Sequence, residues 1–186
     1  MLQVTWEWLG MAPALDLANT VAVTEDHEHD LVASTRDYDE WARVESGFLP
    51  EGSADLLRRH RRELLEVRAA VRDLLAAVSA GGRPSGAAVE VLNALSRRVP
   101  EWPELDDTSW SVETRTDAGA RDRLLARYAR AAMELVATEA NGLRRCPAPS
   151  CGMFYVRTRG SQRWCSTQCG TRARVARHYR ARRETS

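Results

Sequence analysis

All four cysteines of the chain lie within its last 41 residues, and their spacing suits a metal site. Four residues separate the first pair, three separate the second pair, and 13 residues lie between the pairs. Two thiol pairs at short spacing, joined by a loop of this length, are typical of one tetrahedral zinc ion. We therefore predict a single zinc ion bound by Cys146, Cys151, Cys165 and Cys169.

Four thiolates would fill the coordination sphere of the zinc ion, so the metal is expected to be structural rather than catalytic. A module of about 40 residues buries too little apolar surface to fold alone, so metal binding would supply much of its folding free energy. Two disulfides or an iron–sulfur cluster remain as alternatives to zinc. Paired cysteines in a reducing compartment more often bind metal than form disulfides.

The segments between the cysteines must bring the four thiols to one point. The prolines between the first two cysteines indicate a stiff turn. We predict two short strands over residues 153–156 and 162–164, joined by a loop with Gly160 at its turn. Cys165 and Cys169 are four residues apart, so they would share one face of a first helical turn. The turn, the strand pair and the helix together predict a treble-clef-like module.

Charge is distributed unevenly along the chain. Residues 1–142, called the body below, carry 16 arginines against 25 acidic residues, a net charge of −9. Residues 143–186, called the zinc module, carry 11 arginines against one acidic residue, a net charge of +10. A basic module on an acidic body is typical of nucleic-acid binding, because phosphate groups attract the first and repel the second. We therefore place a domain boundary between residues 142 and 143.

The segment after Cys169 is dense in arginine and predicts a basic helix that contacts double-stranded DNA. Arginine forms paired hydrogen bonds with phosphate or with a guanine edge, which lysine cannot reproduce. The chain has no lysine at all, although a GC-rich genome also accounts for this. The alternative is a solvated cationic helix packed against the acidic body. The predicted DNA contacts are Arg159, Arg163, Arg172, Arg174, Arg177, Arg180 and Arg183.

The body is predicted to be mainly helical, because its apolar residues recur three and four positions apart. Because one small β-hairpin is expected in the body and the zinc module follows the body in the sequence, we predict a mainly α (α+β) fold class. The expected elements are a strand or extended arm over 3–8, a helix over 14–23, a polar loop over 26–30, a helix capped by Ser34 or Thr35, helices over 53–80 and from Ser85 to before Pro100, a hairpin over 103–116, and a helix from an Asp117 cap to Asn141.

The zinc module resembles the CGNR-type zinc finger, which is named for a Cys-Gly-Asn-Arg tetrad. The resemblance rests on the spacing of the first cysteine pair, on Phe154, and on residues 163–166 and 169–174. The tetrad reads Cys-Gly-Thr-Arg here, so Thr171 stands where the family has asparagine. Either residue can form a hydrogen bond with nearby backbone, so the fold should be retained. If the family's asparagine reads a base, the sequence preference of this chain differs.

The body resembles the ABATE domain, the usual companion of that finger. Residues 15–20 match its opening signature, residues 38–41 match its second helix, and Trp110 fits the hairpin before its last helix. The two resemblances together span nearly the whole chain. They imply a stress-induced bacterial transcription regulator, with the four cysteines as zinc ligands and Arg172 as the tetrad arginine.

The body is expected to act as a sensor or as a dimerisation platform for a homodimer. A helical bundle with an apolar pocket could bind a small-molecule effector. Asp16 and Asn19 lie on a mostly apolar segment. One interpretation is that they cap a helix or form a buried hydrogen bond. The other is that they contact a ligand in a pocket of the body.

Other function classes receive less support from the sequence. An RNA-binding or protein-interaction zinc module is the main alternative to a DNA-binding regulator. We expect no enzyme, because the chain has no nucleophile–base motif, phosphate-binding glycine loop or dinucleotide fingerprint. No apolar run approaches the roughly 18 residues of a membrane span, and no leader pattern is present, so a cytoplasmic location is expected.

Overall fold

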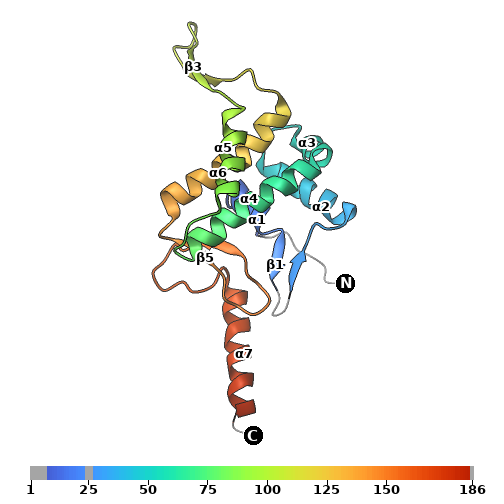
Figure 1. Cartoon of the computed structure of the whole chain (residues 1–186), viewed down its shortest axis with the longest axis vertical. Helices are drawn as coiled ribbons and strands as arrows, with labels where there is room; N and C mark the ends of the chain where they lie inside the picture. Colours follow the sequence, from blue (N-terminus) through green and yellow to red (C-terminus); the bar gives the residue numbers. More distant parts are fainter. Residues whose placement is uncertain (1–7, 24–26, 185–186) are drawn as a thin grey trace.

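The computed structural model describes residues 8–23 and 27–184, and it is mostly helical with three small antiparallel strand pairs (Figure 1). This confirms the predicted fold class. Nearly all of the arm expected over residues 3–8 lies outside the described residues. The elements are α1 (Pro13–Ala18), β1 (Val21–Val23), β2 (Glu28–Asp30), α2 (Thr35–Glu45), η1 (Ser46–Phe48), α3 (Ser53–Arg59), α4 (Arg61–Ser79), α5 (Gly86–Arg97), β3 (Trp102–Leu105), β4 (Val112–Arg115), α6 (Ala120–Glu139), β5 (Leu143–Arg145), β6 (Phe154–Val156) and α7 (Thr167–Glu184).

The centre of the body is formed by α4, α5 and α6, which pack on one another, with α1 against α4 and α6 (Figure 1). Each of the long helices buries the apolar face that its three- and four-residue spacing predicts. The largest fully buried side chains are Trp41, Tyr38 and Tyr128, which come from α2 and α6. The core therefore joins segments from the whole length of the body.

Two helix starts lie where the sequence places them. The Ser34 hydroxyl accepts a hydrogen bond from the backbone N–H of Asp37 at 3.1 Å, which caps α2. The Ser85 hydroxyl accepts from the N–H of Ala88 at 3.1 Å and caps α5 in the same way. Each cap satisfies a helix donor that would otherwise have no partner within the helix.

The predicted hairpin is also present, and it projects from the rest of the body (Figure 1). Its strands β3 and β4 pair from Trp102 opposite Arg115 to Leu105 opposite Val112. The Asp106 carboxylate accepts hydrogen bonds from the N–H groups of the second and third residues after it, at 2.9 and 2.8 Å. An aspartate at the turn therefore shapes the loop, as its position in the sequence indicates.

The helix predicted over residues 53–80 is wrong as a single element. It is divided at His60 into α3 and α4, and His60 has φ −106° and ψ 26°. The Leu57 carbonyl near the end of α3 accepts a hydrogen bond from the Tyr38 hydroxyl at 2.8 Å, which fastens α3 to α2. Since α3 packs against α2 while α4 runs through the core, one straight helix could not serve both contacts.

The first predicted helix is also too long. It ends at Ala18, and Val21–Val23 instead forms strand β1, which pairs with β2 at Glu28–Asp30 in the segment predicted as a loop. The arginines of α4 fix this ribbon, since Arg68 binds both carboxylate oxygens of Asp30 at 2.8 and 2.6 Å. The strand thus depends on a partner 38 residues away, which local periodicity does not reveal.

The predicted Asp117 cap is wrong as well. Helix α6 begins at Ala120 with Gly119 at the N-cap position, and no side chain caps it. The segment before it turns locally instead, because the Thr116 hydroxyl accepts from the N–H of the second residue after it at 3.2 Å. Asp122 in the first turn supplies negative charge near the positive end of the helix dipole.

Candidate zinc centre and nucleic-acid interface

The four cysteine Sγ atoms lie within 4.8 Å of one another. Cys165 Sγ is 3.6 Å from that of Cys151 and 3.5 Å from that of Cys169. Four sulfurs at about 2.3 Å from a zinc ion would be about 3.8 Å apart in a tetrahedron, so the cluster fits one zinc ion. All four cysteines are free, since these distances far exceed the about 2.05 Å of a disulfide bond.

The first two cysteines lie on a tight turn that follows β5. The N–H of Cys146 donates to the Met153 carbonyl at 2.8 Å and closes this turn. Ser150 and Gly152, on either side of Cys151, both have positive φ. Glycine is favoured at position 152 for two reasons. Its φ is positive, and a Cβ atom there would lie 2.5 Å from the Cβ of Val23 in the body.

The second two cysteines lie at the start of α7. Cys169 is in the first turn of the helix and Cys165 precedes the helix by two residues, so only one of them has the predicted helical position. The Ser166 hydroxyl accepts from the N–H of Cys169 at 3.2 Å, which directs the first turn toward the cluster. The backbone N–H of Cys165 donates to Cys146 Sγ at 3.5 Å and joins the two pairs.

The predicted strand pair within the zinc module is wrong in its partner. Strand β6 (Phe154–Val156) is present, but it pairs with β5 (Leu143–Arg145) and not with residues 162–164. The Gln162 side chain accepts hydrogen bonds from the N–H and hydroxyl of Thr158, at 3.0 and 3.2 Å, so this segment forms a compact turn. Strand β5 has only three residues, too few for its pattern to predict it.

Asn19 joins the body to the zinc module. Its side-chain Nδ2 donates to the Phe154 carbonyl at 3.0 Å, and its Oδ1 accepts from the Phe154 N–H at 2.8 Å. The Val23 N–H also donates to the Cys151 carbonyl at 2.9 Å. Phe154 is buried in the body core, and the guanidinium groups of two arginines, Arg72 and Arg145, each lie 5.8 Å from its ring centre. Hydrogen bonds from the body to the backbone of Cys151 and Phe154 therefore fix the cysteine cluster to the body.

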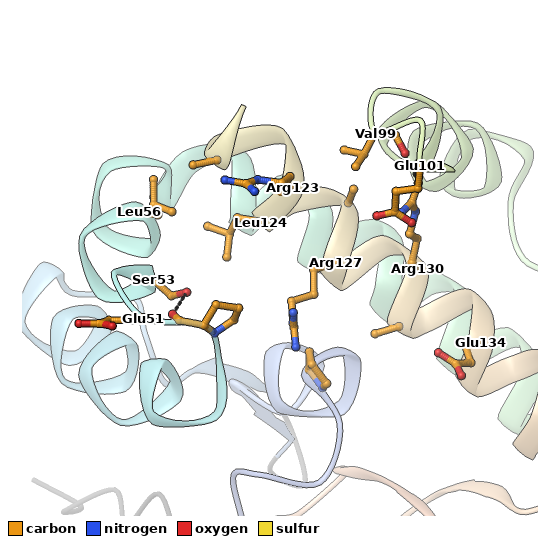
Figure 2. Close-up of a pocket in the computed structure, with 15 residues that line it drawn as sticks. Glu51, Ser53, Leu56, Val99, Glu101, Arg123, Leu124, Arg127, Arg130 and Glu134 are labelled. Carbon is orange, nitrogen blue, oxygen red and sulfur yellow. Dashed lines mark hydrogen bonds and ion pairs between the residues drawn. The ribbon is translucent and has the colours of Figure 1, made fainter. Parts of the chain in front are cut away.

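Asp16 and Asn19 are both fully buried. Asn19 makes the buried hydrogen bonds that were one of its two expected roles, and it also ends α1. Asp16 Oδ2 accepts from the N–H of Gly10 at 3.0 Å, and burial raises the pKa of Asp16 to about 6. Neither side chain lines the pocket drawn in Figure 2.

The arginines predicted to contact DNA do not all have the same surroundings. Arg172 donates from Nη1 to the carbonyls of Pro149 and Ser150, both at 3.0 Å, and so holds α7 against the first cysteine turn. The Arg163 guanidinium lies 5.9 Å from the Trp164 ring centre. Five of the predicted contacts are exposed: Arg159, Arg163, Arg172, Arg174 and Arg177. Two others lie on α7, but their side chains are outside the described residues: Arg180 and Arg183.

Thr171, which replaces the tetrad asparagine, makes the local hydrogen bond predicted for it. Its hydroxyl donates to the Thr167 carbonyl at 3.2 Å and accepts from Arg174 at 3.0 Å. Gly170 beside it lets the Trp164 ring approach, since a Cβ there would lie 3.2 Å from the ring. The tetrad thus has a structural role in packing the helix onto the cluster.

Helix α7 extends away from the body, so it is not the cationic helix packed on an acidic surface that the sequence left open (Figure 1). Ala173 packs on the cysteine cluster, while Val175 and Tyr179 are 49% and 63% exposed. Helix α7 therefore presents an exposed basic surface to solvent. Within the parts of the chain that the structure describes, no helix combines the length and apolar character needed to cross a bilayer.

Comparisons with known families agree with this architecture. The ABATE model, described as "Putative stress-induced transcription regulator", matches residues 11–139. The model of the CGNR zinc finger matches residues 143–183, which include all four clustered cysteines. No curated protein matches the chain.

Proposed function

We propose that this chain, which belongs to the ABATE family and carries a CGNR zinc finger, is a zinc-dependent transcription regulator that binds double-stranded DNA through α7. The observation that carries the proposal is the position of α7. The helix starts at the cysteine cluster, extends into solvent, and contains six arginines but only one acidic residue, Glu184 at its end.

The zinc ion would contribute by fixing the direction of the helix. Cys169 is a ligand within the first turn, and Arg172 holds the same turn against the other cysteine pair. A helix anchored in this way loses little conformational freedom on binding, so its arginines can contact DNA at a low entropic cost. Four thiolates leave zinc no open position for a substrate, which supports a regulator rather than an enzyme.

The exposed arginines would contact different parts of the DNA. Arg174 and Arg177 are three residues apart, so they lie near each other on a helix that could enter the major groove. Arg159 and Arg163 are exposed on the loop before the helix and would contact phosphates beside it. The acidic body would be repelled by the backbone, which favours an approach by the zinc module first.

The body would supply regulation, as a sensor of a small-molecule effector, as a dimerisation platform, or as both. A cytoplasmic location and a homodimer are parts of this proposal. A homodimer would present two copies of α7, so it would favour two spaced half-sites in the DNA.

The test is selection of random duplex DNA by the zinc-loaded full chain at about physiological salt, with sequencing of the retained fraction. A reproducible motif is expected, and its symmetry would report the number of chains bound. Retention without a motif would contradict sequence-specific regulation. Preferential retention of single-stranded RNA in a parallel selection would instead favour an RNA-binding module.

A further inference from the structure

We propose that the pocket between α1, α3 and α6 binds a small organic anion with an apolar skeleton and one carboxylate or similar charged group. This site goes beyond DNA binding and gives the regulatory part of the proposed function a ligand class. It is tested without DNA, so a negative result would leave the DNA-binding proposal intact.

The pocket has the size of a small-molecule site. Its volume is about 600 Å³, within the range of roughly 300 to 1,000 Å³ typical of ligand pockets. Its walls come from the start of α1, the segment that leads into α3, the segment that follows α5, and one face of α6 (Figure 2). Much of this lining is apolar: Pro13, Pro50, Leu56, Val99, Leu124 and Ala126. Such a lining would favour a ligand with a ring or an alkyl chain.

One arginine of the lining is already neutralised. Arg130 forms an ion pair with Glu101 at 2.6 Å, and its Nε donates to the Ser96 hydroxyl at 3.1 Å. It also donates to the carbonyls of Ser96 and Val99. Arg130 and Glu101 therefore form part of the wall and have little capacity for a ligand.

Arg127 is different, because it has no hydrogen bond or ion pair with any described residue. Figure 2 shows its side chain extending from α6 into the middle of the pocket, toward α1. The carboxylates of Glu51 and Glu134 lie at opposite edges of the view, away from it. The positive charge of Arg127 tends to lower the pKa of buried Glu45, but the Glu45 carboxyl group accepts its hydrogen bond from Tyr128 and not from Arg127. A guanidinium above apolar walls is complementary to an amphipathic anion, with which it can form two charge-assisted hydrogen bonds.

The pocket is mechanically connected to the zinc module through one short helix. Pro13, at the first position of α1, lines the pocket, and Asn19 follows the last residue of the same helix. Asn19 holds both backbone groups of Phe154 in the zinc module. A ligand that contacts Pro13 would therefore contact the helix that anchors the zinc module. Ligand binding in the pocket could in this way alter the position of the proposed DNA-binding helix.

The experiment titrates the zinc-loaded full chain with 8-anilino-1-naphthalenesulfonate and follows probe fluorescence. N-phenyl-1-naphthylamine, which has the same ring skeleton without the charge, is the matched uncharged probe. Arg127→Met removes the proposed anion partner but keeps an apolar side chain. Arg62→Met is the control, because Arg62 is 88% exposed on α4 and carries the same charge outside the pocket.

We expect saturable binding of the anionic probe at one site, weakened about tenfold or more by Arg127→Met and unchanged by Arg62→Met. Arg127→Met should leave the affinity for the uncharged probe unaltered. The proposal is overturned if the anionic probe shows no saturable site, if both variants bind it like the parent chain, or if the uncharged probe binds as tightly as the anionic one. Since Arg127 is exposed, its substitution should not disturb folding, and circular dichroism checks this.

Discussion

Asn19 and Phe154 are 135 residues apart in the sequence and exchange two hydrogen bonds in the protein interior. The carboxamide of Asn19 binds the free edge of β6, whose other edge pairs with β5. A side chain thereby takes the place of a neighbouring strand. Both backbone groups of Phe154 are satisfied, and β6 is held against α1.

Replacing this side chain should destabilise the whole protein. Asn19→Ala would leave two buried peptide groups without partners, at a cost of about 1–3 kcal/mol each, so we expect a decrease of about 2–6 kcal/mol in the free energy of unfolding. Urea denaturation followed by circular dichroism measures it. Asn93→Ala on α5, where the asparagine is only half-buried, is the control and should change stability much less. Equal effects of the two substitutions would contradict the bridging role of Asn19.

Removal of zinc should unfold only part of the zinc module. Phe154 and Leu143 belong to the body core, whereas the small cluster around the cysteines has few other apolar neighbours. In Cys165→Ala, or after chelation, we expect rapid amide exchange in α7 and retained protection in β5, β6 and the body helices. Hydrogen exchange read by mass spectrometry resolves these segments. Protection of α7 that persisted without metal would show that zinc does not hold the helix.

Glu45 should make the body less stable as the pH rises. It is fully buried, its Oε1 accepts from the Tyr128 hydroxyl at 2.8 Å, and burial together with the nearby Asp16 raises its pKa to about 8. The folded state thus holds this proton more tightly than the unfolded state, whose pKa is near 4.5. The free energy of unfolding should therefore fall as the pH increases from about 4.5 to about 8.

Glu45→Gln tests this dependence, because an amide resembles the protonated acid. We expect the variant to melt above the parent chain at pH 8 and the difference to disappear toward pH 5. Glu40→Gln, an exposed position on the same helix, serves as the control and should show no such trend. A melting difference for Glu45→Gln that did not vary with pH would indicate a packing effect instead.

The exposed arginines of α7 should differ from Arg172 in what they contribute to DNA binding. Arg177→Ala and Arg174→Ala should each weaken binding, and each should reduce the slope of log affinity against log salt by about 0.9 if its guanidinium neutralises one phosphate. Arg172→Ala should also lower the melting temperature, because it removes the hydrogen bonds to the first cysteine turn. Fluorescence anisotropy at several salt concentrations gives the slopes. Arg83 is exposed in a loop of the body, so Arg83→Ala should leave the slope unchanged. If Arg83→Ala changed the slope as much as Arg174→Ala and Arg177→Ala, the α7 arginines would not be specific contacts with DNA.

The sequence was most informative where local chemistry decides the structure. The cysteine spacing predicted four residues that the fold brings together, and Ser34 and Ser85 cap helices as short-range hydrogen bonding requires. Distant partners decide the rest. His60 interrupts a continuous helical pattern because α3 and α4 have different neighbours, and β6 pairs with a three-residue strand that carries no pattern of its own. For Asn19, burial could be expected, but its partner could not.

The length of α7 also sets how far its charge stands from the rest of the molecule. Eighteen residues at about 1.5 Å each make a helix about 27 Å long. At physiological ionic strength the field of a charge decays over about 8 Å, so the last turns of α7 lie beyond the screened reach of the acidic body. The helix therefore acts as an electrostatic spacer: one small chain can carry a net charge near zero and still present a strongly cationic end.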